Sequence, residues 1–524
     1  MQARQASRYF FYAKTIAMSV NFRTRLQVIE FGLMRMFILV ALILSSMAIV
    51  LIPRGSIQSS AGVGALLLIG LALAICCVAL ASLVAMNIQR GVVLARLSRI
   101  SLGKLIAGGA LLQIGAAFIF HPVQLSDSAV YLRLAHQLSQ GKPYQDTAGF
   151  LAFWPPGLPL YLTPFVRVIR SDFYALLLAN LLLYCLAARS IYSLARTLFD
   201  KHVAIVSTML FVIWPSRILL TTLASKETLT LTTVVMSLAI AVRIHTARSR
   251  ISNDCFALAL GFLLGLSALA QPGLTLLFCL FPVGLWFLWK RFTLSALLRL
   301  FAFVAVMFLM TIAPWIVRNY TVFDGQFIGI ATNGGSVFYR ANNDESGAEY
   351  SSRGTIDLSG LSELEQNAEG FRLGKQWLFE HPIQEMRLAS KKLAALLDND
   401  SQGVYWAVQR GGGEIHKAED AQASRAIIGD VLNLVSYWYW MMLCAAVSLV
   451  CMRTLRDDSP MTYPVALLVM PLIYCAVVFS IFESGARQHI FAGPALIIVA
   501  ALNVRQPRDE FFQSSWISRK LAIS

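Results

Sequence analysis

The chain has 524 residues, of which 57% are hydrophobic and only 14% are charged, whereas a soluble domain usually carries about a quarter charged residues. Many apolar runs reach the ~17–25 residues that cross a bilayer as a helix, and they lack the strand-type alternation of a membrane barrel. This composition excludes an ordinary soluble enzyme and predicts an all-α, multi-pass membrane protein. The net charge of +16 does not indicate nucleic-acid binding, because the basic residues cluster between apolar runs as topology signals.

Cysteine and histidine give no sign of disulfide or metal chemistry. The eight cysteines lie in or beside apolar runs, so a disulfide framework is not expected. The seven histidines show no HxxxH spacing, which would mark a zinc site on a helix. We therefore assign no metal ligand and no firm cofactor from the sequence.

About twelve apolar segments are long enough to be spans. The first follows a basic, aromatic N-terminal stretch and has no small-residue cleavage site, so we interpret it as a retained span rather than a signal peptide. The expected spans are 36–52, 61–86, 103–120, 173–196, 203–222, 228–243, 255–271, 273–289, 296–316, 433–452, 462–482 and 488–503.

Basic residues are concentrated in alternate connections between these spans. One set of connections contains most of them, namely Arg90, Arg96, Arg99, Lys104, Arg196, Lys201, Arg243, Arg248, Arg250, Lys290, Arg291, Arg299, Arg453 and Arg456. The opposite short loops contain only Arg54, Arg217, Lys226 and Arg487. Because basic loops stay in the cytoplasm, this bias predicts a protein of the cytoplasmic (inner) membrane with both termini inside.

Residues 155–170 are apolar but short and interrupted by prolines. If they crossed the membrane, every later basic cluster would face outward, so we expect an interfacial helix on the outer surface. The region 317–432 also lies outside; it has 11 basic and 16 acidic residues and predicts a small, partly helical outer domain of mixed charge. The resulting division is 1–102, an N-terminal segment with two additional spans; 103–316, a membrane core with a first outer loop at 121–172; 317–432, the outer domain; and 433–524, the last spans and tail.

Very few carboxylates face outward beside the spans. Asp127 begins a plausible helix, SDSAVYLRLAHQL, in which Tyr131 shares its face. Glu227 follows Ser-Lys at the outer start of a later span. Each acid alone has an ordinary alternative, a helix cap for Asp127 and favourable charge at a helix N-terminus for Glu227. Two such acids also fit one outer cavity, in which they would carry chemistry.

The outward cations Arg217, Lys226, Arg318 and Arg487 lie at the ends of spans. Singly, each is typical of a side chain that anchors the span at lipid headgroups. Together they fit a lipid-linked phosphate, because the fork of a guanidinium matches phosphate oxygens.

The order of these features resembles a known family. After the early Asp come an aromatic-Pro-Pro-Gly segment (Trp154, Pro155, Pro156, Gly157, Pro159, Tyr161), Ala-Arg-Thr-Leu-Phe at 195–199, Glu227, PWIVRNY at 314–320, TNGG at 332–335 and the late Arg487. From about residue 103 to 503 the chain resembles the GT-C glycosyltransferases of family 39, in the branch of the protein O-mannosyltransferases and the lipid A aminoarabinose transferases. The first two spans lie outside the resemblance.

This resemblance implies a GT-C-like helical bundle that takes a sugar from a polyprenyl-phosphate donor and transfers it at the outer membrane face. Asp127 matches the family's catalytic acid of the first outer loop, and Glu227 matches its second acid. Ser128 stands where many members have a second acid, and Trp154 stands where some have a lysine.

The substrate site expected from sequence therefore has several members beside the two acids. The residues assigned to substrate or phosphate binding are Tyr131, Trp154, Pro155, Pro156, Lys226, Arg318, Asn333 and Arg487. A divalent metal shared by two carboxylates stays a minority alternative. The expected partners are the donor, membrane lipids and a glycan, lipid or protein acceptor, with no nucleic acid.

Two other functions stay open at this point. A transporter or flippase would carry charges at the centres of its spans, whereas here polar chemistry concentrates at one face. A polysaccharide ligase or polymerase would use a similar carrier on the same side, and we expect its outer loop to be larger and rich in Arg and His.

Overall fold

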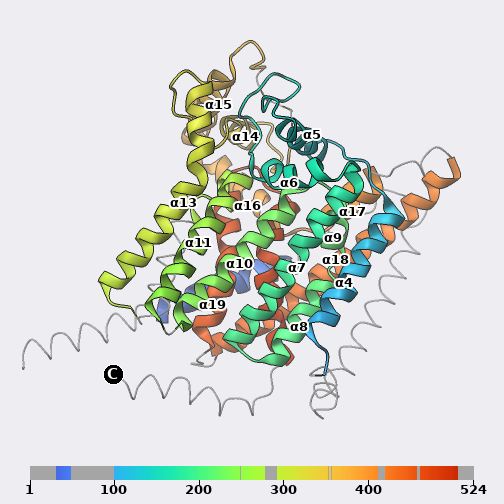
Figure 1. Ribbon diagram of the computed structural model, residues 1–524, viewed down its shortest axis with the longest axis vertical. Helices are drawn as coiled ribbons and strands as arrows, with labels where there is room; N and C mark the ends of the chain where they lie inside the picture. Colours follow the sequence, from blue (N-terminus) through green and yellow to red (C-terminus); the bar gives the residue numbers. More distant parts are fainter. Residues whose placement is uncertain are drawn as a thin grey trace, which may run out of the picture.

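The computed structural model describes residues 31–48, 99–247, 249–277, 292–351, 353, 355, 357–410, 419–456 and 461–504. Every regular element within these residues is helical, and long helices stand side by side in a bundle (Figure 1). The elements of the first half are α4 Leu102–Phe120, α5 Asp127–Ser139, α6 Gly157–Val168, α7 Asp172–Leu198, α8 Lys201–Val212, α9 Pro215–Leu220, α10 Lys226–Thr246, α11 Arg250–Ala270 and η1 Pro272–Leu274. Those of the second half are α13 Leu294–Val322, α14 Gly334–Ala341, α15 Glu363–Glu380, α16 Pro382–Leu397, α17 Gln402–Val404, η2 Tyr405–Arg410, α18 Glu419–Arg456, α19 Thr462–Phe479, η4 Ala486–Ala492, α20 Gly493–Ala501 and η5 Leu502–Val504.

Nine helical stretches within the described residues are long and apolar enough to cross a membrane. They agree with nine of the expected spans, and this number of apolar helices indicates a multi-pass membrane protein. They are Phe31–Ala48, Leu102–Phe120, Asp172–Leu198, Lys226–Thr246, Arg250–Ala270, Leu294–Val322, Ala426–Arg456, Thr462–Phe479 and Ala486–Val504.

The other three expected spans do not appear as single long helices. The span predicted at 61–86 lies outside the described residues, as does most of the one at 273–289. The span predicted at 203–222 is broken into α8 and α9, because Pro215 follows Trp214 and cannot continue the helix of the preceding residues.

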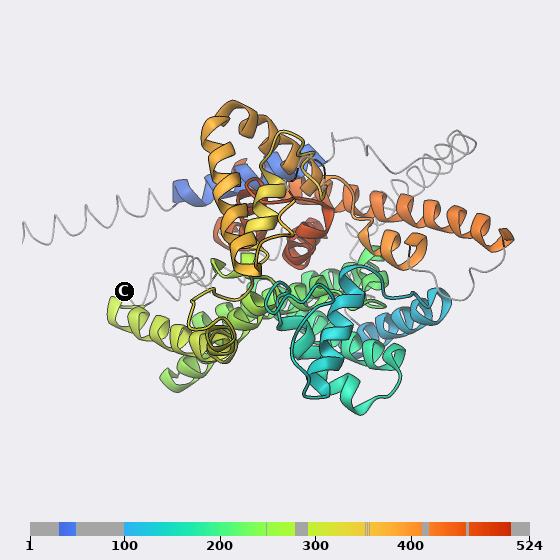
Figure 2. The ribbon, with the colours of Figure 1, turned by 90° about the horizontal axis from the view of Figure 1, so that it is seen from above.

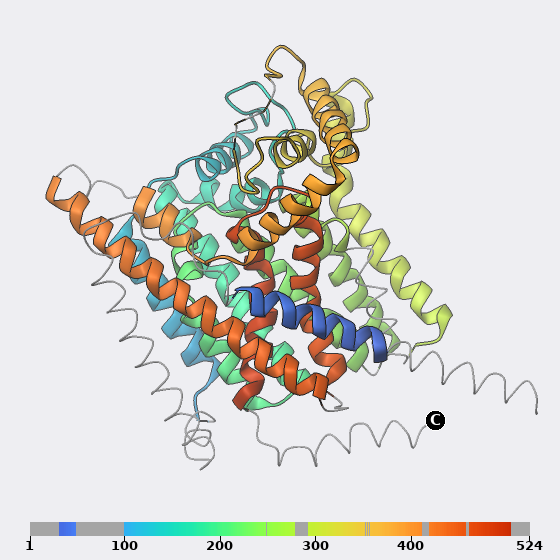
Figure 3. The same cartoon turned by 180° about the vertical axis from the view of Figure 1, so that it is seen from behind.

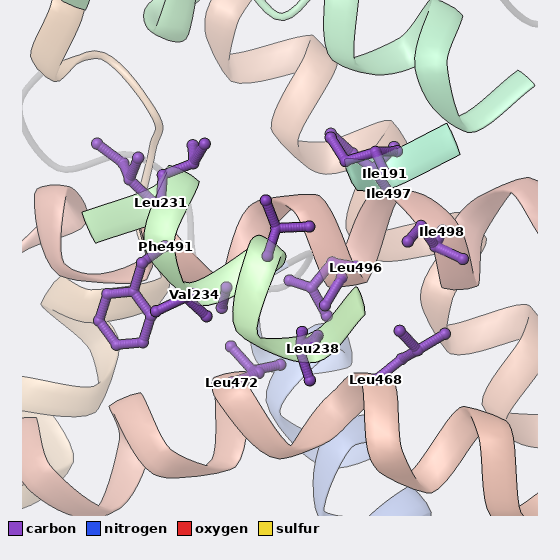
Figure 4. Packing of buried hydrophobic residues seen from close by; sticks show 14 of the residues in the cluster. Ile191, Leu231, Val234, Leu238, Leu468, Leu472, Phe491, Leu496, Ile497 and Ile498 are labelled. Carbon is purple, nitrogen blue, oxygen red and sulfur yellow. The ribbon is translucent and has the colours of Figure 1, made fainter. Parts of the chain in front are cut away.

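Helices α10 and α20 lie at the centre of the bundle. Along α10 most side chains are buried, and four of its threonines donate their hydroxyls to backbone carbonyls of the same helix, namely Thr230, Thr232, Thr233 and Thr246. Figure 4 shows this core, in which apolar side chains of five elements meet: Ile191, Leu231, Val234, Leu238, Leu468, Leu472, Phe491, Leu496, Ile497 and Ile498. Seen from behind, the helix Phe31–Ala48 crosses the outside of the red C-terminal helices (Figure 3). Ser45 Oγ lies 2.7 Å from Ser448 Oγ of α18.

The helices at the upper end of Figure 1 do not belong to the bundle. Here α5 and α6 lie at the same end of the molecule as α14 and α15 (Figure 1), and the view from above separates the teal pair from the yellow and orange helices (Figure 2). Helix α6 has only 12 residues, too few to span, and packs on α5 and α7. The region 317–432 is described here as helices and loops, with α13 continuing into it as far as Val322 and α18 beginning within it at Glu419.

Candidate active site

A pocket opens where α5, α10, α17 and η4 begin. It contains about 530 Å³ of space between atoms, a volume that includes open solvent. Its lining comes from four distant stretches of chain: Val123, Leu125, Ser126, Asp127, Ser128 and Tyr131; Leu220, Leu223, Ala224, Ser225, Lys226 and Glu227; Gln402 and Trp406; and Arg487. The structure thus brings together both predicted acids and two of the predicted cations.

Two amide side chains, one from the segment before α5 and one from α7, hold the segment before α10 in place. Gln124 Nε2 donates to the Thr222 carbonyl at 3.2 Å, and Gln124 Oε1 accepts from Ala224 N–H at 2.9 Å. The buried Asn180 of α7 donates to the carbonyls of Thr221 and Leu223 at 2.8 and 3.0 Å. A non-helical stretch inside a bundle leaves its backbone groups without helix partners, and these amides satisfy them. Asp127 and Glu227 therefore face one pocket.

Asp127 is the first residue of α5, and its side chain is 38% exposed. Its Oδ2 accepts from Arg487 Nη1 at 3.1 Å, and its Oδ1 accepts from Ser126 Oγ at 3.3 Å. Ser126 at the N-cap makes no capping hydrogen bond through its side chain. The negative charge of Asp127 in the first turn still interacts favourably with the positive end of the helix dipole. Its oxygens, however, face the pocket and, among the described residues, accept no hydrogen bond from backbone amides.

Glu227 and Lys226 open α10 and are both half-buried. Glu227 Oε2 accepts from Ser225 Oγ at 2.7 Å, which orients the carboxylate at the helix start. Since α5 and α10 both begin at the pocket, their free N–H groups favour an anion there. Lys226 adds a full positive charge to the same wall.

Arg487 is the guanidinium of the site and comes from η4. It donates to Asp127 and also lies 3.7 Å from Glu483 Oε1 through Nη2. Glu483 is nearly buried, and its other oxygen lies 3.3 Å from Arg340 Nη2 of α14. A series of ion pairs thus connects the outer helix α14 to Asp127. A guanidinium has five N–H donors, so Arg487 can serve more than one anion.

Tyr131 lies one turn after Asp127 and is buried beneath it. Burial raises the pKa of its phenol well above the ordinary value, and the nearby Asp127 and Glu227 raise it further. The group therefore stays a hydrogen-bond donor. The Tyr131 ring packs edge-on against Trp154, with 5.5 Å between centroids, and Trp154 Nε1 donates to Asp146 at 3.1 Å. Trp154 leads into Pro155 and Pro156, which are buried ahead of α6 and do not line the pocket.

The structure does not bring Arg318 and Asn333 to the pocket. Arg318 donates to the carbonyls of Leu151 and Tyr144 at 2.7 and 3.1 Å and lies over the Trp315 ring. It fastens the first outer loop to the end of α13, so its donors are engaged away from the predicted phosphate. Asn333 occupies the N-cap position of α14, without a capping hydrogen bond from its side chain.

Several residues of this arrangement, Gln124, Glu483, Gln402 and Trp406 among them, are not predicted as site members from the sequence. Gln124 and Glu483 hold pocket residues in place, whereas Gln402 and Trp406 form a wall, with Trp406 Nε1 donating to Gln402 Oε1 at 3.1 Å. One feature of the sequence could have identified Glu483, because it is one of the few acids expected to face outward beside the spans. The others had no such feature, because a glutamine or tryptophan beside an apolar run is ordinary in a sequence.

Asp127 and Glu227 both line the pocket, and Asp127 engages a guanidinium there. Among the described residues, no three His, Cys, Asp or Glu side chains come together. Two carboxylates with waters and a substrate phosphate are the usual ligands of Mg²⁺, so the alternative of a shared divalent cation stays open.

No protein-family profile matches the chain, and no curated protein matches it. Solved structures of the Archaeoglobus fulgidus oligosaccharyltransferase show a weak likeness. Its apo form gives a TM-score of 0.45 at 14% identity, covering 81% of this chain and 52% of that one. Its form tethered to an acceptor peptide gives 0.46 at 14%, with coverage of 79% and 50%. The AglB complex with an inhibitory peptide and a dolichol-phosphate gives 0.44 at 13%, with coverage of 80% and 52%. This chain spans about half the length of these structures, and a likeness this weak assigns neither family nor function.

Proposed function

We propose that this protein is a membrane glycosyltransferase that moves a sugar from a polyprenyl-phosphate donor to an acceptor. The observation that carries the proposal is the pocket in which Asp127 and Glu227 lie beside Arg487 and Lys226, at one end of an apolar helical bundle. Carboxylates beside cations are what transfer from a glycosyl phosphate requires, and the apolar surroundings suit a lipid carrier. The motif order that resembles family 39 of the GT-C enzymes supports the same assignment.

In the proposed reaction the acceptor hydroxyl attacks the anomeric carbon of the donor. The bond from this carbon to the phosphate oxygen breaks as the bond to the acceptor oxygen forms, and the acceptor proton passes to Asp127. The leaving group is polyprenyl phosphate, whose charge Arg487 and Lys226 stabilise. In this scheme Arg487 exchanges its contact with Asp127 for a contact with the donor phosphate, which frees the carboxylate to act as base.

The remaining pocket residues have supporting roles in this proposal. Glu227 accepts hydrogen bonds from hydroxyls of the sugar or the acceptor, and Tyr131 donates one. Trp154, Pro155 and Pro156 hold the pocket wall behind Tyr131, and the helices of 317–432 help to select a glycan, lipid or protein acceptor. The proposed steps use protein side chains alone, and a divalent metal shared by the two carboxylates is the alternative.

The charge bias of the loops supports a placement in the cytoplasmic membrane. Both termini would then be cytoplasmic, and the pocket would face the outer side together with α5, α14 and α15. Membrane lipids surround the bundle, and the polyprenyl tail lies among them.

Purified protein in lipid nanodiscs provides the test. Given a polyprenyl-phosphate sugar and a mixture of cell-envelope acceptors, it should release polyprenyl phosphate and transfer the sugar. We expect Asp127→Asn to lower this rate by ~10²–10⁴-fold, the usual contribution of a general base, while its thermal unfolding stays unchanged. Near-normal transfer by this variant would remove Asp127 from the role of base. Movement of the carrier across vesicles without turnover would instead support a flippase.

A further inference from the structure

A buried pair of titratable side chains lies directly behind the pocket. Asp400 and His489 are each completely buried, and Asp400 Oδ1 lies 3.7 Å from His489 Nε2. Asp400 precedes α17 by two residues and His489 follows Arg487 by two residues. The pair therefore connects the two segments that supply Gln402 and Arg487 to the pocket.

The hydrogen bonds around the pair determine how many protons it holds. His489 Nδ1 lies 2.6 Å from the Leu396 carbonyl, which can only accept, so Nδ1 carries a proton. The other ring nitrogen, Nε2, faces a carboxylate oxygen, and neither atom has another hydrogen-bond partner. If neither His489 Nε2 nor Asp400 Oδ1 carried a proton, two hydrogen-bond acceptors would face each other in a buried site, which is strongly unfavourable. One further proton must therefore lie on His489 Nε2 or on Asp400 Oδ1, and in both cases the pair is neutral as a whole.

The surroundings of the pair supply hydrogen bonds and ring contacts rather than a compensating cation. Trp214 Nε1 donates to Asp400 Oδ2, and the Trp440 ring stacks on His489 with 4.0 Å between centroids. From α18, the phenol of Tyr439 and the thiol of Cys444 lie near Asp400.

The buried Arg217 contacts groups other than Asp400. Arg217 of α9 lies over the rings of Tyr184 and Phe211 and donates to the Val212 carbonyl at 3.3 Å. Its charge acts on Tyr439 as well. The buried carboxylate thus depends on His489 and the shared proton.

The segment that follows Asp400 is inserted tightly into the bundle. Gly403 N–H donates to Ser216 Oγ at 3.0 Å, and a Cβ on Gly403 would lie 2.1 Å from the Ser216 carbonyl oxygen. Only glycine allows this approach. A segment so closely packed transmits a shift of Asp400 to Gln402 and Trp406 at the pocket wall.

We propose that Asp400 and His489 form a positioning pair, holding one shared proton, that aligns Arg487 with the pocket wall formed by Gln402 and Trp406. Neither residue touches the pocket, so both act through their neighbours. The catalytic consequence of the pair rests on the function proposed above, whereas the pair itself can be tested without any substrate.

Thermal unfolding of single and double variants tests the pairing. His489→Phe should lower the unfolding temperature by several degrees, because it leaves a buried carboxylate without its proton donor. Asp400→Asn should lower it less, since the amide oxygen still accepts from Trp214 and the amide nitrogen can donate to neutral His489. The double variant should recover part of the His489→Phe loss. A double variant as unstable as the sum of both singles would overturn the pairing.

The positioning role is tested by amide hydrogen exchange. The double variant should exchange faster at 400–410 and 486–493, the two segments joined by the pair, and bind polyprenyl phosphate severalfold more weakly. Ser45→Ala, which removes a buried hydrogen bond to Ser448 outside the pocket, is the control and should change neither. Unchanged exchange at both segments would overturn the proposal. Failure of the wild-type protein to bind polyprenyl phosphate would overturn the proposed function, while faster exchange would still support the pair.

Discussion

Arg487 Nη1 lies 3.1 Å from Asp127 Oδ2, although 360 residues separate them in the chain. The contact joins the start of η4 to the start of α5 and closes one side of the pocket. Glu483 faces the same guanidinium from the other side at 3.7 Å, and it also faces Arg340 of α14. The catalytic role proposed for Asp127 therefore depends on a cation that can exchange between two carboxylates and a donor phosphate.

Arg487→Gln should reduce transfer by ~10²–10³-fold, the usual effect of removing one donor that stabilises developing charge. Arg487→Lys should retain part of the activity, because it keeps the charge but loses the planar fork. Initial rates at varied donor concentration measure both. Arg453→Gln, at the opposite end of α18 from the outer helices, is the matched control and should keep normal rates. Equal rates for all three variants would contradict a phosphate contact.

Tyr131→Phe should lower the transfer rate by up to about tenfold, the value of one hydrogen bond of ~0.5–1.5 kcal/mol. Burial and two neighbouring acids raise the pKa of the Tyr131 phenol, so it stays protonated through and beyond neutral pH. The substitution should therefore leave the shape of the pH–rate profile unchanged between about pH 6 and 9, below the ordinary phenol pKa. A profile that loses its alkaline limb in this variant would show that the phenol titrates after all.

Gln124→Ala should lower both stability and transfer. It removes the partners of Ala224 N–H and the Thr222 carbonyl, and each group left unpaired costs ~1–3 kcal/mol. The starts of α5 and α10 would then be held together less tightly. Unfolding temperature and initial rate are the measurements, and the exposed Gln140→Ala is the matched control. If both variants behave alike, the amide does not organise the pocket.

Lys392→Met should destabilise the outer helices by ~3–5 kcal/mol, since removing one partner of a buried pair leaves the other uncompensated. Lys392 is completely buried and donates to Asn342 Oδ1, Glu385 Oε1 and the Ile481 carbonyl at 2.8, 3.2 and 3.2 Å. Burial lowers the pKa of Lys392 and raises that of Glu385, while each opposes the shift of the other. Adding Glu385→Gln should restore part of the unfolding temperature. No recovery in the double variant would mean that the pair is not coupled.

Chelation should not change the rate of transfer. The pocket offers Asp127 and Glu227 beside Arg487, and no cluster of three metal-ligating side chains occurs among the described residues. Rates measured with excess EDTA, and again after adding magnesium or manganese, check this. A rate that falls with EDTA and returns with the metal would support the alternative of a cation shared by the two carboxylates.

The sequence already determined the membrane class and most of the spans, since both depend on local properties. Nine expected spans agree with helices because each is long and apolar in itself. The sequence predicts one span where the structure has α8 and α9, because the apolar content of the stretch outweighs the signal of Pro215. Asp127 and Glu227 could be selected because outward acids beside spans are scarce.

Only the tertiary structure decided which of the selected charges meet. Arg487 and Lys226 reach the pocket whereas Arg318 fastens a loop, although all three lie at the ends of apolar segments. The difference arises from contacts between distant segments, such as Gln124 with Ala224 and Asp400 with His489, which leave no periodicity or local composition in the chain. The neighbouring residues in the sequence determine which helix a side chain belongs to and how deep it lies in the membrane. Its contacts with distant segments of the fold determine which chemical role it can take.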